Sequence, residues 1–420
     1  MAADDIARNW GGNHQFRATR LHRPRTIDDV ASLAQQAQHL RVVGSRHSFT
    51  DIADSDEVVT LADLDRDVEL DEDAGTITVP AQTTYGDVAR MLQPHGLALH
   101  NMASLPDVSV AGAIATATHG GGATNGNLAT SVAGLEIVTT SGEIVHVDRS
   151  SIDFDGMVVS LGRLGIVTAV TLDVQFDYEI EQHLFEHLSL DVLASAFEAI
   201  LSTAYSVSVF TDYGDEGGRV WIKRRTDGRD RSLRPGQVFH EAIAATAEQH
   251  PIPGLTPTHC TRQLGVPGPW CDRLPHFRIG ARPSDGDEQQ SEFFVDLAAG
   301  PAALEALRAR RADFGPAMMV SEIRAVAADE LWLSPQYGRD SAAFHFTWVN
   351  DDAAVDAAVR AVEEALAPFA PRPHWGKVFH HDAFSAAAAY VCLDDFADLA
   401  HRFDPHGVFV NDWWRRHIGV

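Results

Sequence analysis

The sequence predicts an α+β fold with two domains, of which the second is built on an antiparallel sheet with flanking helices. The 420 residues exceed what a single hydrophobic core usually organises. Helical and strand-like patterns alternate up to about residue 178, and strand-like alternation dominates the chemistry-bearing stretches after it. We therefore expect a first domain over residues 1–178, completed by residues from about 385 to 420, and a second domain over residues 179–384.

The first domain is expected to open with a helix and then a strand. A helix is predicted from near Thr26 to Leu40, because Thr26 can cap it and Val30, Leu33 and Ala34 recur at helical spacing. The other elements expected in this domain are a strand over 42–43, a strand over 76–79, a helix over 85–92, a hairpin of 135–140 with 143–147 and a strand over 166–176.

The loop after the first strand has a composition suited to anion binding and to nucleophilic chemistry. In the stretch 42–48, backbone N–H groups around Gly44 and Ser45 can converge on a phosphate. The same loop carries His47, and a neutral imidazole is a good nucleophile. Gly-Ser loops are common after strands, so this loop taken alone is more often an ordinary turn than a cofactor site.

A second informative stretch is almost free of large side chains. Residues 111–118 are mostly Ala, Gly and Thr, and 120–122 are three glycines. Tight packing of a helix against a sheet also selects Ala and Gly, but a closely bound cofactor better explains the hydroxyl groups. The tract lacks the G-x-G-x-x-G pattern of a Rossmann domain, which disfavours nicotinamide binding of that kind.

The second domain begins with strand-like stretches and continues into a long irregular segment. Strands are expected over 204–211 and 220–223, joined by the loop 212–218, and an irregular excursion is expected over 225–290. Three later stretches, 321–325, 343–348 and 374–379, also alternate as strands.

Alternation in the later stretches separates an apolar face from a polar one, because residues i and i+2 share a face of a strand. Phe344, Phe346 and Trp348 are expected on one face, and His345 and Thr347 on the other.

The same reasoning places Glu322 and Arg324 opposite Ile323, and Lys377 on one face with Trp375. A solvated sheet face shows the same alternation, and spacing alone favours that interpretation. The mixed chemistry of these side chains and the neighbouring aromatic residues favour a ligand-binding front instead. The residues expected on this front are Glu322, Arg324, His345, Thr347 and Lys377.

Composition excludes several classes of partner. A net charge of −26 argues against nucleic acid or an anionic membrane surface. The three cysteines form neither a disulfide framework nor a metal-ligand pattern. We see no secretory signal and no apolar stretch long enough to span a bilayer. The expectation is a cytoplasmic protein with reduced thiols and no metal site.

Five short motifs of the chain are similar to those of a known family: Gly44–Ser48, Asn101–Pro106, Val110–Gly112, Thr116–Gly120 and Leu161–Gly165. In these motifs the chain resembles the flavin domain of the vanillyl-alcohol oxidase superfamily and, within it, the bacterial alditol oxidases. Residues Phe403–Asn411 resemble the segment that returns to the flavin domain in this superfamily. One departure is Arg46, because the residue before the histidine is usually glycine in these enzymes.

The resemblance implies FAD bound in an extended conformation, with His47 attached covalently to the flavin 8α-methyl carbon. It implies Ser104, Glu322, Arg324, Thr347 and Lys377 as substrate-binding residues, with Arg324, Lys377 and His345 as catalytic residues. The implied cofactor-binding residues are Val43, Gly44, Ser45, Arg46, His47, Ser48, Ser104, Leu105, Ser109, Gly112, Ala113, Ile114, Thr116, Thr118, His119, Gly165 and Ile166.

The implied activity is that of an oxidoreductase acting on polyols. A flavoprotein of this family would oxidise the terminal primary hydroxyl of an alditol such as xylitol or sorbitol to the aldose. Hydride would pass from C1 to flavin N5, and dioxygen would be reduced to hydrogen peroxide. The polyol and dioxygen are then the expected partners of a monomer.

Two alternatives remain open at this point. One is a gulono- or galactono-1,4-lactone oxidase or dehydrogenase of the same superfamily, in which similar motifs occur. The other is a flavin-binding module without enzyme activity, whose acidic surface would face a partner.

Overall fold

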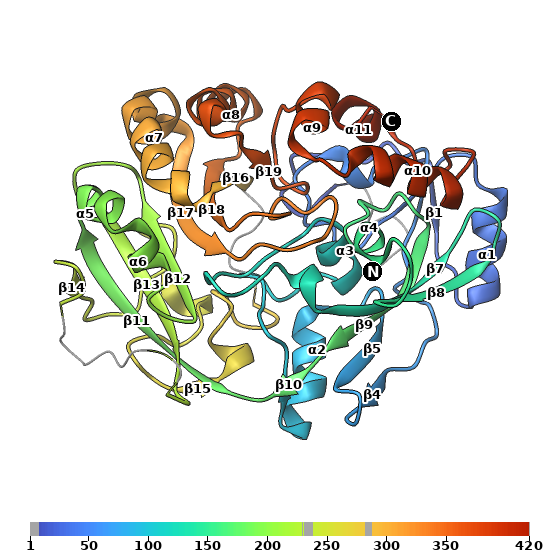
Figure 1. Ribbon diagram of the computed structural model, residues 1–420, viewed down its shortest axis with the longest axis horizontal. Helices are drawn as coiled ribbons and strands as arrows, with labels where there is room; N and C mark the ends of the chain where they lie inside the picture. The colour runs from blue at the N-terminus through green and yellow to red at the C-terminus, as the bar shows by residue number, and fades with distance from the viewer. Residues whose placement is uncertain (1–7, 229, 231–237, 282–287, 420) are drawn as a thin grey trace.

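Two sheet-containing halves stand side by side in the computed structural model, which describes residues 8–228, 230, 238–281 and 288–419 (Figure 1). The chain crosses from the first half to the second between β10 (Gln175–Phe176) and β11 (Glu179–Leu188). The first half carries a parallel and an antiparallel sheet, and the second half is organised on one nine-stranded sheet. The α+β class expected from the sequence is confirmed.

Helix α1 (Ile27–Gln36) begins where the sequence predicts, because Thr26 and Asp29 form a capping box. The Asp29 N–H donates to the Thr26 hydroxyl at 3.1 Å, and the Thr26 N–H donates to the Asp29 carboxylate at 3.0 Å. The helix ends at Gln36, so its predicted extension toward Leu40 is wrong. Leu40 instead begins β2 (Leu40–Val42), where its side chain is buried and its N–H donates to the carbonyl of Val408.

The first half combines a three-stranded parallel sheet, ordered β1-β3-β2, with a five-stranded antiparallel sheet, ordered β4-β5-β9-β7-β8. The predicted hairpin is β7 with β8, and its turn contains Gly142 at a φ of +80°. The strands of the first half are β1 (Arg20–His22), β2, β3 (Glu57–Val59), β4 (Glu69–Asp71), β5 (Thr76–Pro80), β6 (Leu97–Ala98), β7 (Val132–Val138), β8 (Ile144–Asp148), β9 (Ile166–Asp173) and β10. Its helices are α1, α2 (Tyr85–Leu92), α3 (Val110–Ala115) and α4 (Phe154–Val158).

The C-terminal segment packs back onto the first half. It contains α9 (Ala383–Ala389), α10 (Leu393–Phe403) and α11 (Asp412–His417). The Asn411 side-chain amide donates to the carbonyls of Asp51, Ile52 and Asp54, immediately after the Gly-Ser-Arg-His loop. Buried Asp404 also pairs with Arg163. These contacts tie the returning segment to the loop that carries His47.

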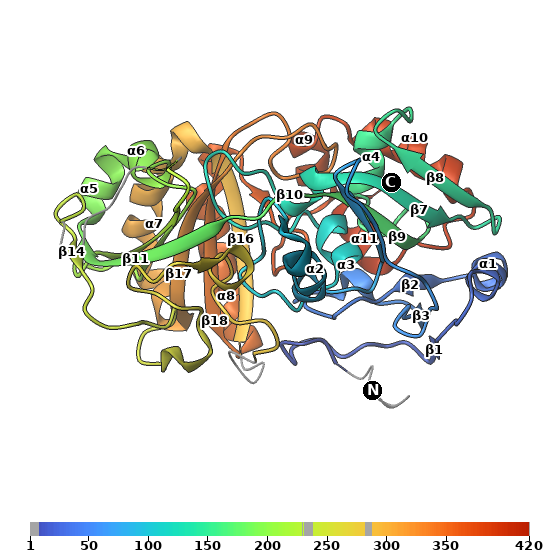
Figure 2. The same cartoon turned by 90° about the horizontal axis from the view of Figure 1, so that it is seen from below.

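The nine-stranded sheet of the second half is antiparallel, with β14 toward its outer edge and β16 to β19 toward the first half (Figures 1 and 2). Helices α7 (Gly300–Phe314) and α8 (Asp352–Leu366) pack together on one face of it. Its strands are β11, β12 (Ser206–Thr211), β13 (Gly218–Arg225), β14 (Ile243–Ala244), β15 (Gly268–Pro269), β16 (Glu288–Asp296), β17 (Met318–Val326), β18 (Ser341–Val349) and β19 (Arg372–Pro373). The two short helices of this half are α5 (Leu190–Ser195) and α6 (Phe197–Leu201).

The predicted alternation of β18 is confirmed. The rings of Phe346 and Trp348 stack at 5.0 Å, and both meet Phe314 of α7 edge-on. His345 and Thr347 point the other way and line a cavity between the halves. The sheet therefore has an apolar back under the helices and a polar front toward the first half.

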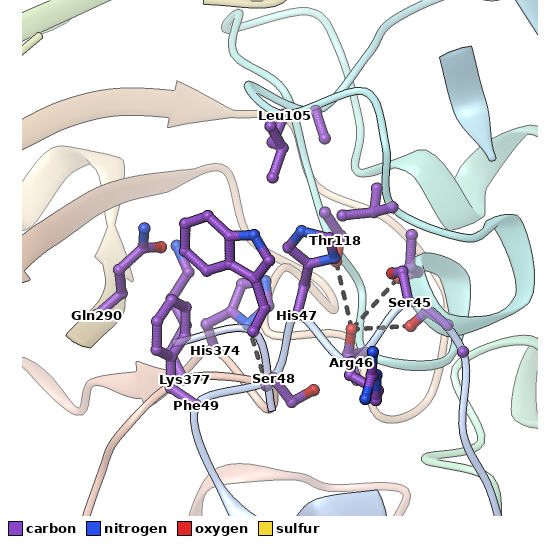
Figure 3. A pocket seen from close by; sticks show the side chains of 18 of the residues that line it. Ser45, Arg46, His47, Ser48, Phe49, Leu105, Thr118, Gln290, His374 and Lys377 are labelled. Carbon is purple, nitrogen blue, oxygen red and sulfur yellow. Dashed lines mark hydrogen bonds between the residues drawn. The ribbon is translucent and has the colours of Figure 1, made fainter. Parts of the chain in front are cut away.

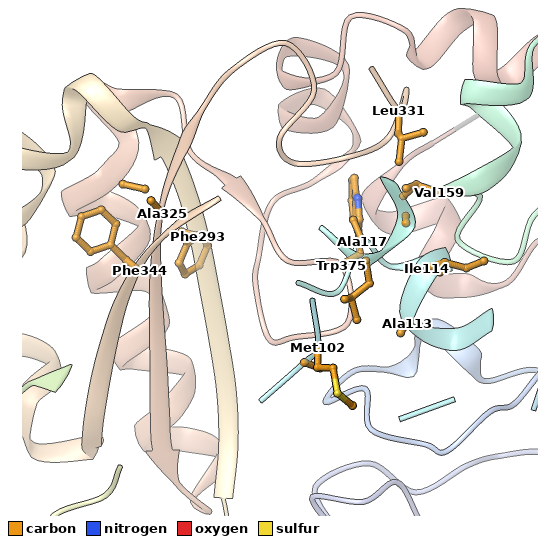
Figure 4. Packing of buried hydrophobic residues seen from close by; sticks show 14 of the residues in the cluster. Met102, Ala113, Ile114, Ala117, Val159, Phe293, Ala325, Leu331, Phe344 and Trp375 are labelled. Carbon is orange, nitrogen blue, oxygen red and sulfur yellow. The ribbon is translucent and has the colours of Figure 1, made fainter. Parts of the chain in front are cut away.

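The predicted strand over 374–379 is wrong. Only Arg372–Pro373 pairs as β19, and the chain then turns, with the Lys377 N–H donating to the carbonyl of His374 at 3.0 Å. Trp375 consequently does not share a face with Lys377. Its indole packs against Tyr390 at 4.7 Å and lies among residues of the first half, away from Phe293 and Phe344 (Figure 4).

Strand β16 was not expected, because its N-terminal part falls within the segment assigned to the irregular excursion. The excursion itself is confirmed over the described residues between 226 and 281, where only the two-residue strands β14 and β15 and short helical turns occur.

Buried apolar residues of both halves join one hydrophobic cluster, so the five-stranded sheet and the nine-stranded sheet share a core (Figure 4). None of the described helices is both long and apolar enough to cross a bilayer.

Candidate active site

A large cavity lies between the loop 41–53, the small-residue tract of the first half and the polar front of the nine-stranded sheet. Figure 3 shows the loop residues Ser45–Phe49 in the same cavity as Gln290, His374 and Lys377. Strands β16, β17 and β18 supply the far wall, and the turn after β19 supplies Lys377.

Close backbone approach explains the glycines of the loop and of α3. A Cβ added at Gly44 would lie 2.3 Å from the Ser109 hydroxyl, and one added at Gly112 would lie 2.8 Å from the same atom. The Ser109 N–H donates to the Ser45 hydroxyl at 3.2 Å, which joins the two segments. The resulting cradle is lined by backbone and small side chains, so a flat, extended ligand can approach it closely.

His47 has the properties of a neutral nucleophile. Its buried Nδ1 has no hydrogen-bond partner among the described residues, and its ring stacks on Trp10 at 5.2 Å. Burial, with a smaller contribution from the Arg46 cation, lowers the pKa of His47 to about 4. The imidazole is therefore uncharged at neutral pH and keeps a lone pair for bond formation.

Arg46 adopts the left-handed backbone conformation that glycine tolerates best. Its φ is +62°, and its carbonyl accepts a hydrogen bond from the Trp10 N–H at 2.9 Å. Arg46 therefore holds a backbone conformation that is strained for a residue with a side chain.

Glu292 of β16 is the hub of a buried charge cluster. Its carboxylate accepts from Lys377 Nζ at 2.7 Å and Arg324 Nη2 at 3.1 Å, and it lies 3.1 Å from His119 Nε2. Burial alone would raise the pKa of Glu292, but Lys377, His119 and Arg324 hold it well below its usual value. Glu292 therefore stays ionised and fixes both cations at the cavity wall.

Glu322 is the second carboxylate of the cluster. One of its oxygens, Oε1, lies 2.9 Å from His276 Nε2 and 3.5 Å from Arg324 Nε. Burial opposes ionisation, yet Arg324 and His276 keep the pKa of Glu322 well below its usual value. Arg324 Nη1 also reaches the Ser104 hydroxyl at 3.4 Å, so the cluster joins both halves of the protein.

His345 faces the cavity beside these charges. Its Nε2 lies 3.1 Å from Gln290 Oε1, and its buried Nδ1 has no hydrogen-bond partner in the described part of the chain. Burial and the Lys377 cation lower the pKa of His345 to about 3. A neutral imidazole with one unused ring nitrogen can accept a proton from a bound hydroxyl.

Most residues singled out in the sequence meet at this cavity. Ile114 and Ile166 do not, because their side chains are buried in hydrophobic clusters of the first half. The other predicted residues on the cavity wall are Val43, Gly44, Ser45, Arg46, His47, Ser48, Ser104, Leu105, Ser109, Gly112, Ala113, Thr116, Thr118, His119, Gly165, Glu322, Arg324, His345, Thr347 and Lys377.

Sequence reasoning missed Glu292, Gln290 and His276. Glu288, Gln290 and Glu292 recur at every second position and all line the cavity, so period-two alternation was the signal that could have found them. His276 lies in the irregular excursion, where no periodicity distinguishes it. Among the described residues, no group of three or more His, Cys, Asp or Glu side chains could hold a metal ion.

Two family models match separate parts of the chain. Residues 18–148 match the family model described as "FAD binding domain", and residues 288–417 match that of "D-arabinono-1,4-lactone oxidase". The first match contains the cradle and His47, and the second contains Glu292, Glu322, Arg324 and Lys377. Residues 18–148 are thus an FAD-binding domain.

Relatives and solved structures extend the match to the whole chain. The chain is 45% identical over 412 residues to the alditol oxidase of Streptomyces sp., covering 97% of each protein. It is 28% identical to an L-gulono-1,4-lactone dehydrogenase of Mycobacterium tuberculosis, over 98% of each. Cholesterol oxidase from Brevibacterium sterolicum has the same fold, with a TM-score of 0.75 at 16% identity over 97% of this chain and 95% of that one. The chain therefore belongs to the alditol oxidase family.

Proposed function

We propose that this protein oxidises the terminal primary hydroxyl of an alditol, such as xylitol or sorbitol, to the aldose. FAD is the cofactor, and dioxygen is the final electron acceptor, giving hydrogen peroxide. The observation that carries the proposal is the buried cluster of Arg324, Lys377, Glu292 and Glu322 on the wall of the FAD-domain cavity. The 45% identity to an alditol oxidase supports the same substrate class.

FAD fits the residues present. The cradle at Gly44, Gly112 and Ser109 is too narrow for added side chains, and the free Nδ1 of His47 lies on the wall of the same cavity. When bound, the isoalloxazine ring supplies the hydride acceptor and the reaction with dioxygen. We propose that His47 is attached to the 8α-methyl carbon, because its ring is neutral and its buried Nδ1 has no hydrogen-bond partner among the described residues.

An alditol carries no charge, so recognition depends on hydrogen bonds to its hydroxyl groups. Glu322 accepts from a substrate hydroxyl, the Thr347 hydroxyl can donate or accept, and the Ser104 hydroxyl lies beside Arg324. A site of this kind rejects analogues that lack a hydroxyl, since its buried polar groups would lose their partners.

Two cations of the cavity wall favour loss of the proton from the reacting hydroxyl. Arg324 and Lys377 stabilise the negative charge that develops on its oxygen, and Glu292 fixes their positions. We propose that His345 Nδ1 accepts the hydroxyl proton, because His345 lines the cavity and this nitrogen has no hydrogen-bond partner among the described residues.

Domain limits follow from the same proposal. Residues 1–178, completed by 385–420, would bind FAD, and residues 179–384 would bind the substrate.

The three cysteines are buried free thiols, which supports a reducing compartment such as the cytoplasm. A monomer is the expected state, and light scattering of the purified protein would measure it.

A lactone is the second candidate substrate. The match of residues 288–417 to a lactone oxidase family and the 28% identity to a lactone dehydrogenase favour it. The alditol oxidase and the lactone dehydrogenase both match this chain over almost its whole length, so measured turnover must distinguish the two substrates.

The deciding experiment is a substrate panel with coupled peroxide detection. Xylitol and sorbitol should give peroxide at rates well above those of gulono- and galactono-1,4-lactone. Turnover of lactones without alditols would replace the proposed substrate class. Yellow colour that remains with the acid-precipitated chain would support covalent FAD.

A further inference from the structure

Behind the polar front, the structure buries a lysine that the reaction described above does not use. Lys223 of β13 is 2% exposed, and no carboxylate of the described residues forms an ion pair with it. Its Nζ donates to the carbonyl of Leu274 and lies 3.0 Å from His276 Nδ1. A buried ammonium group is costly to desolvate, so the two groups that it contacts matter for its stability in this place.

The partners of Lys223 lead to the substrate-facing wall. His276 bridges Lys223 and Glu322, with its Nε2 2.9 Å from Glu322 Oε1. An ionised carboxylate only accepts hydrogen bonds, so Nε2 must carry the imidazole proton. Burial and the Lys223 cation lower the pKa of His276 to about 4, so the ring is neutral. Its Nδ1 is then an acceptor, and Lys223 must donate to it.

We propose that Lys223 is a positioning residue for Glu322, acting through His276, and this inference rests on the alditol oxidation proposed above. The charged lysine polarises the imidazole and strengthens the hydrogen bond from Nε2 to Glu322 Oε1. With Oε1 held in this way, the other carboxylate oxygen is left to accept from the substrate hydroxyl.

The arrangement depends on the charge of Lys223. A neutral amine has a lone pair, so the other tautomer of His276, with its proton on Nδ1, becomes possible and Glu322 loses its donor. Burial lowers the pKa of Lys223 to about 7. The Arg324 cation lowers this pKa further, whereas the Glu322 carboxylate raises it. Besides these groups and His276, Cys260 faces Lys223, and burial raises the pKa of this thiol to about 12, so it stays neutral.

Substitution of Lys223 tests the proposal through the pH dependence of KM. In the wild-type protein, KM for xylitol should rise as the pH passes upward through about 7, because Lys223 loses its charge. Lys223→Met should raise KM about tenfold at pH 6, because one hydrogen bond to a charged group is worth about this factor in binding. In this variant KM should no longer rise as the pH passes through 7. Lys223→Arg keeps the charge and should keep a low KM at pH 9.

Gln182→Met is the matched control. Gln182 is fully buried and pairs with Lys223 across β11 and β13, but it has no hydrogen bond to His276. This variant should keep the wild-type pH profile. A merely structural role for Lys223 would lower the active fraction, measured as kcat per bound flavin, and would leave the KM profile unchanged.

Wild-type KM and pH dependence in Lys223→Met would overturn the proposal. If that variant does not fold, Lys223→Arg decides the question, since a KM that still rises through pH 7 assigns the titration to another group. Failure of the proposed function is seen separately, as absence of alditol turnover by the wild-type protein. The same pH series is then run with whichever lactone it oxidises.

Discussion

Replacing Glu292 with Gln tests how much the buried cluster depends on one carboxylate. The charges of Glu292 and Glu322 balance those of Arg324 and Lys377, and the substitution leaves one positive charge in excess. At an effective dielectric constant near 20, the 2.7 Å contact between Lys377 Nζ and the Glu292 carboxylate is worth about 6 kcal/mol of attraction, before the cost of desolvation. Breaking a buried ion pair from one side costs about 3–5 kcal/mol net, and we expect Glu292→Gln to lower the free energy of unfolding by this amount at pH 7.

The difference between Glu292→Gln and the wild-type protein should depend on pH. The pKa of Glu292 is held well below 4.5 in the folded protein, so its contribution to stability is present above that value and is lost as the pH falls through the folded pKa. Urea unfolding should therefore show the full difference at pH 7 and a smaller one below pH 4.5. Lys377, without its counter-ion, should lose its proton more readily, and we expect kcat/KM to fall about 100-fold.

Glu364→Gln is the control, because Glu364 makes an exposed ion pair with Arg310. Its loss should change stability by less than about 1 kcal/mol. The reasoning is refuted if Glu292→Gln costs no more than this control, or if its cost is the same at pH 7 and pH 3.

Three further substitutions test the loop that carries His47 and the role of Lys377. His47→Ala should leave flavin in the supernatant after acid precipitation and slow its reduction by xylitol; colour in the pellet would place the linkage elsewhere. Arg46→Gly should change stability by less than about 1 kcal/mol in urea unfolding, because relief of the strain at a φ of +62° offsets the greater freedom of the unfolded chain; a loss above about 2 kcal/mol would show that the arginine side chain supports the loop. Lys377→Met should retain flavin but lower turnover by about 100-fold, and a near-normal rate would remove Lys377 from the reaction.

Local rules were sufficient where neighbouring residues determine the structure. The capping box at Thr26 fixed the start of α1, and strict alternation in β18 separated Phe346 from His345. These features depend on hydrogen bonds and faces within a few residues.

The errors have a tertiary origin. Lys377 looks like part of an alternating strand, but the backbone turns there because its N–H bonds the carbonyl of His374 and Trp375 is drawn into the core of the first half. Glu292 reaches the site through pairing of β16 with β18, a contact between residues more than 50 positions apart. Its partners cannot be identified from the residues beside it in the sequence.

The anchoring of residues 51–54 by Asn411 has a consequence for biogenesis. The amide that holds the flank of the His47 loop lies about 360 residues further along the polypeptide than the flank itself. A ribosome must therefore have released residue 411 before this flank is secured. Any nascent polypeptide that stops short of residue 411 therefore lacks the three hydrogen bonds that anchor residues 51–54.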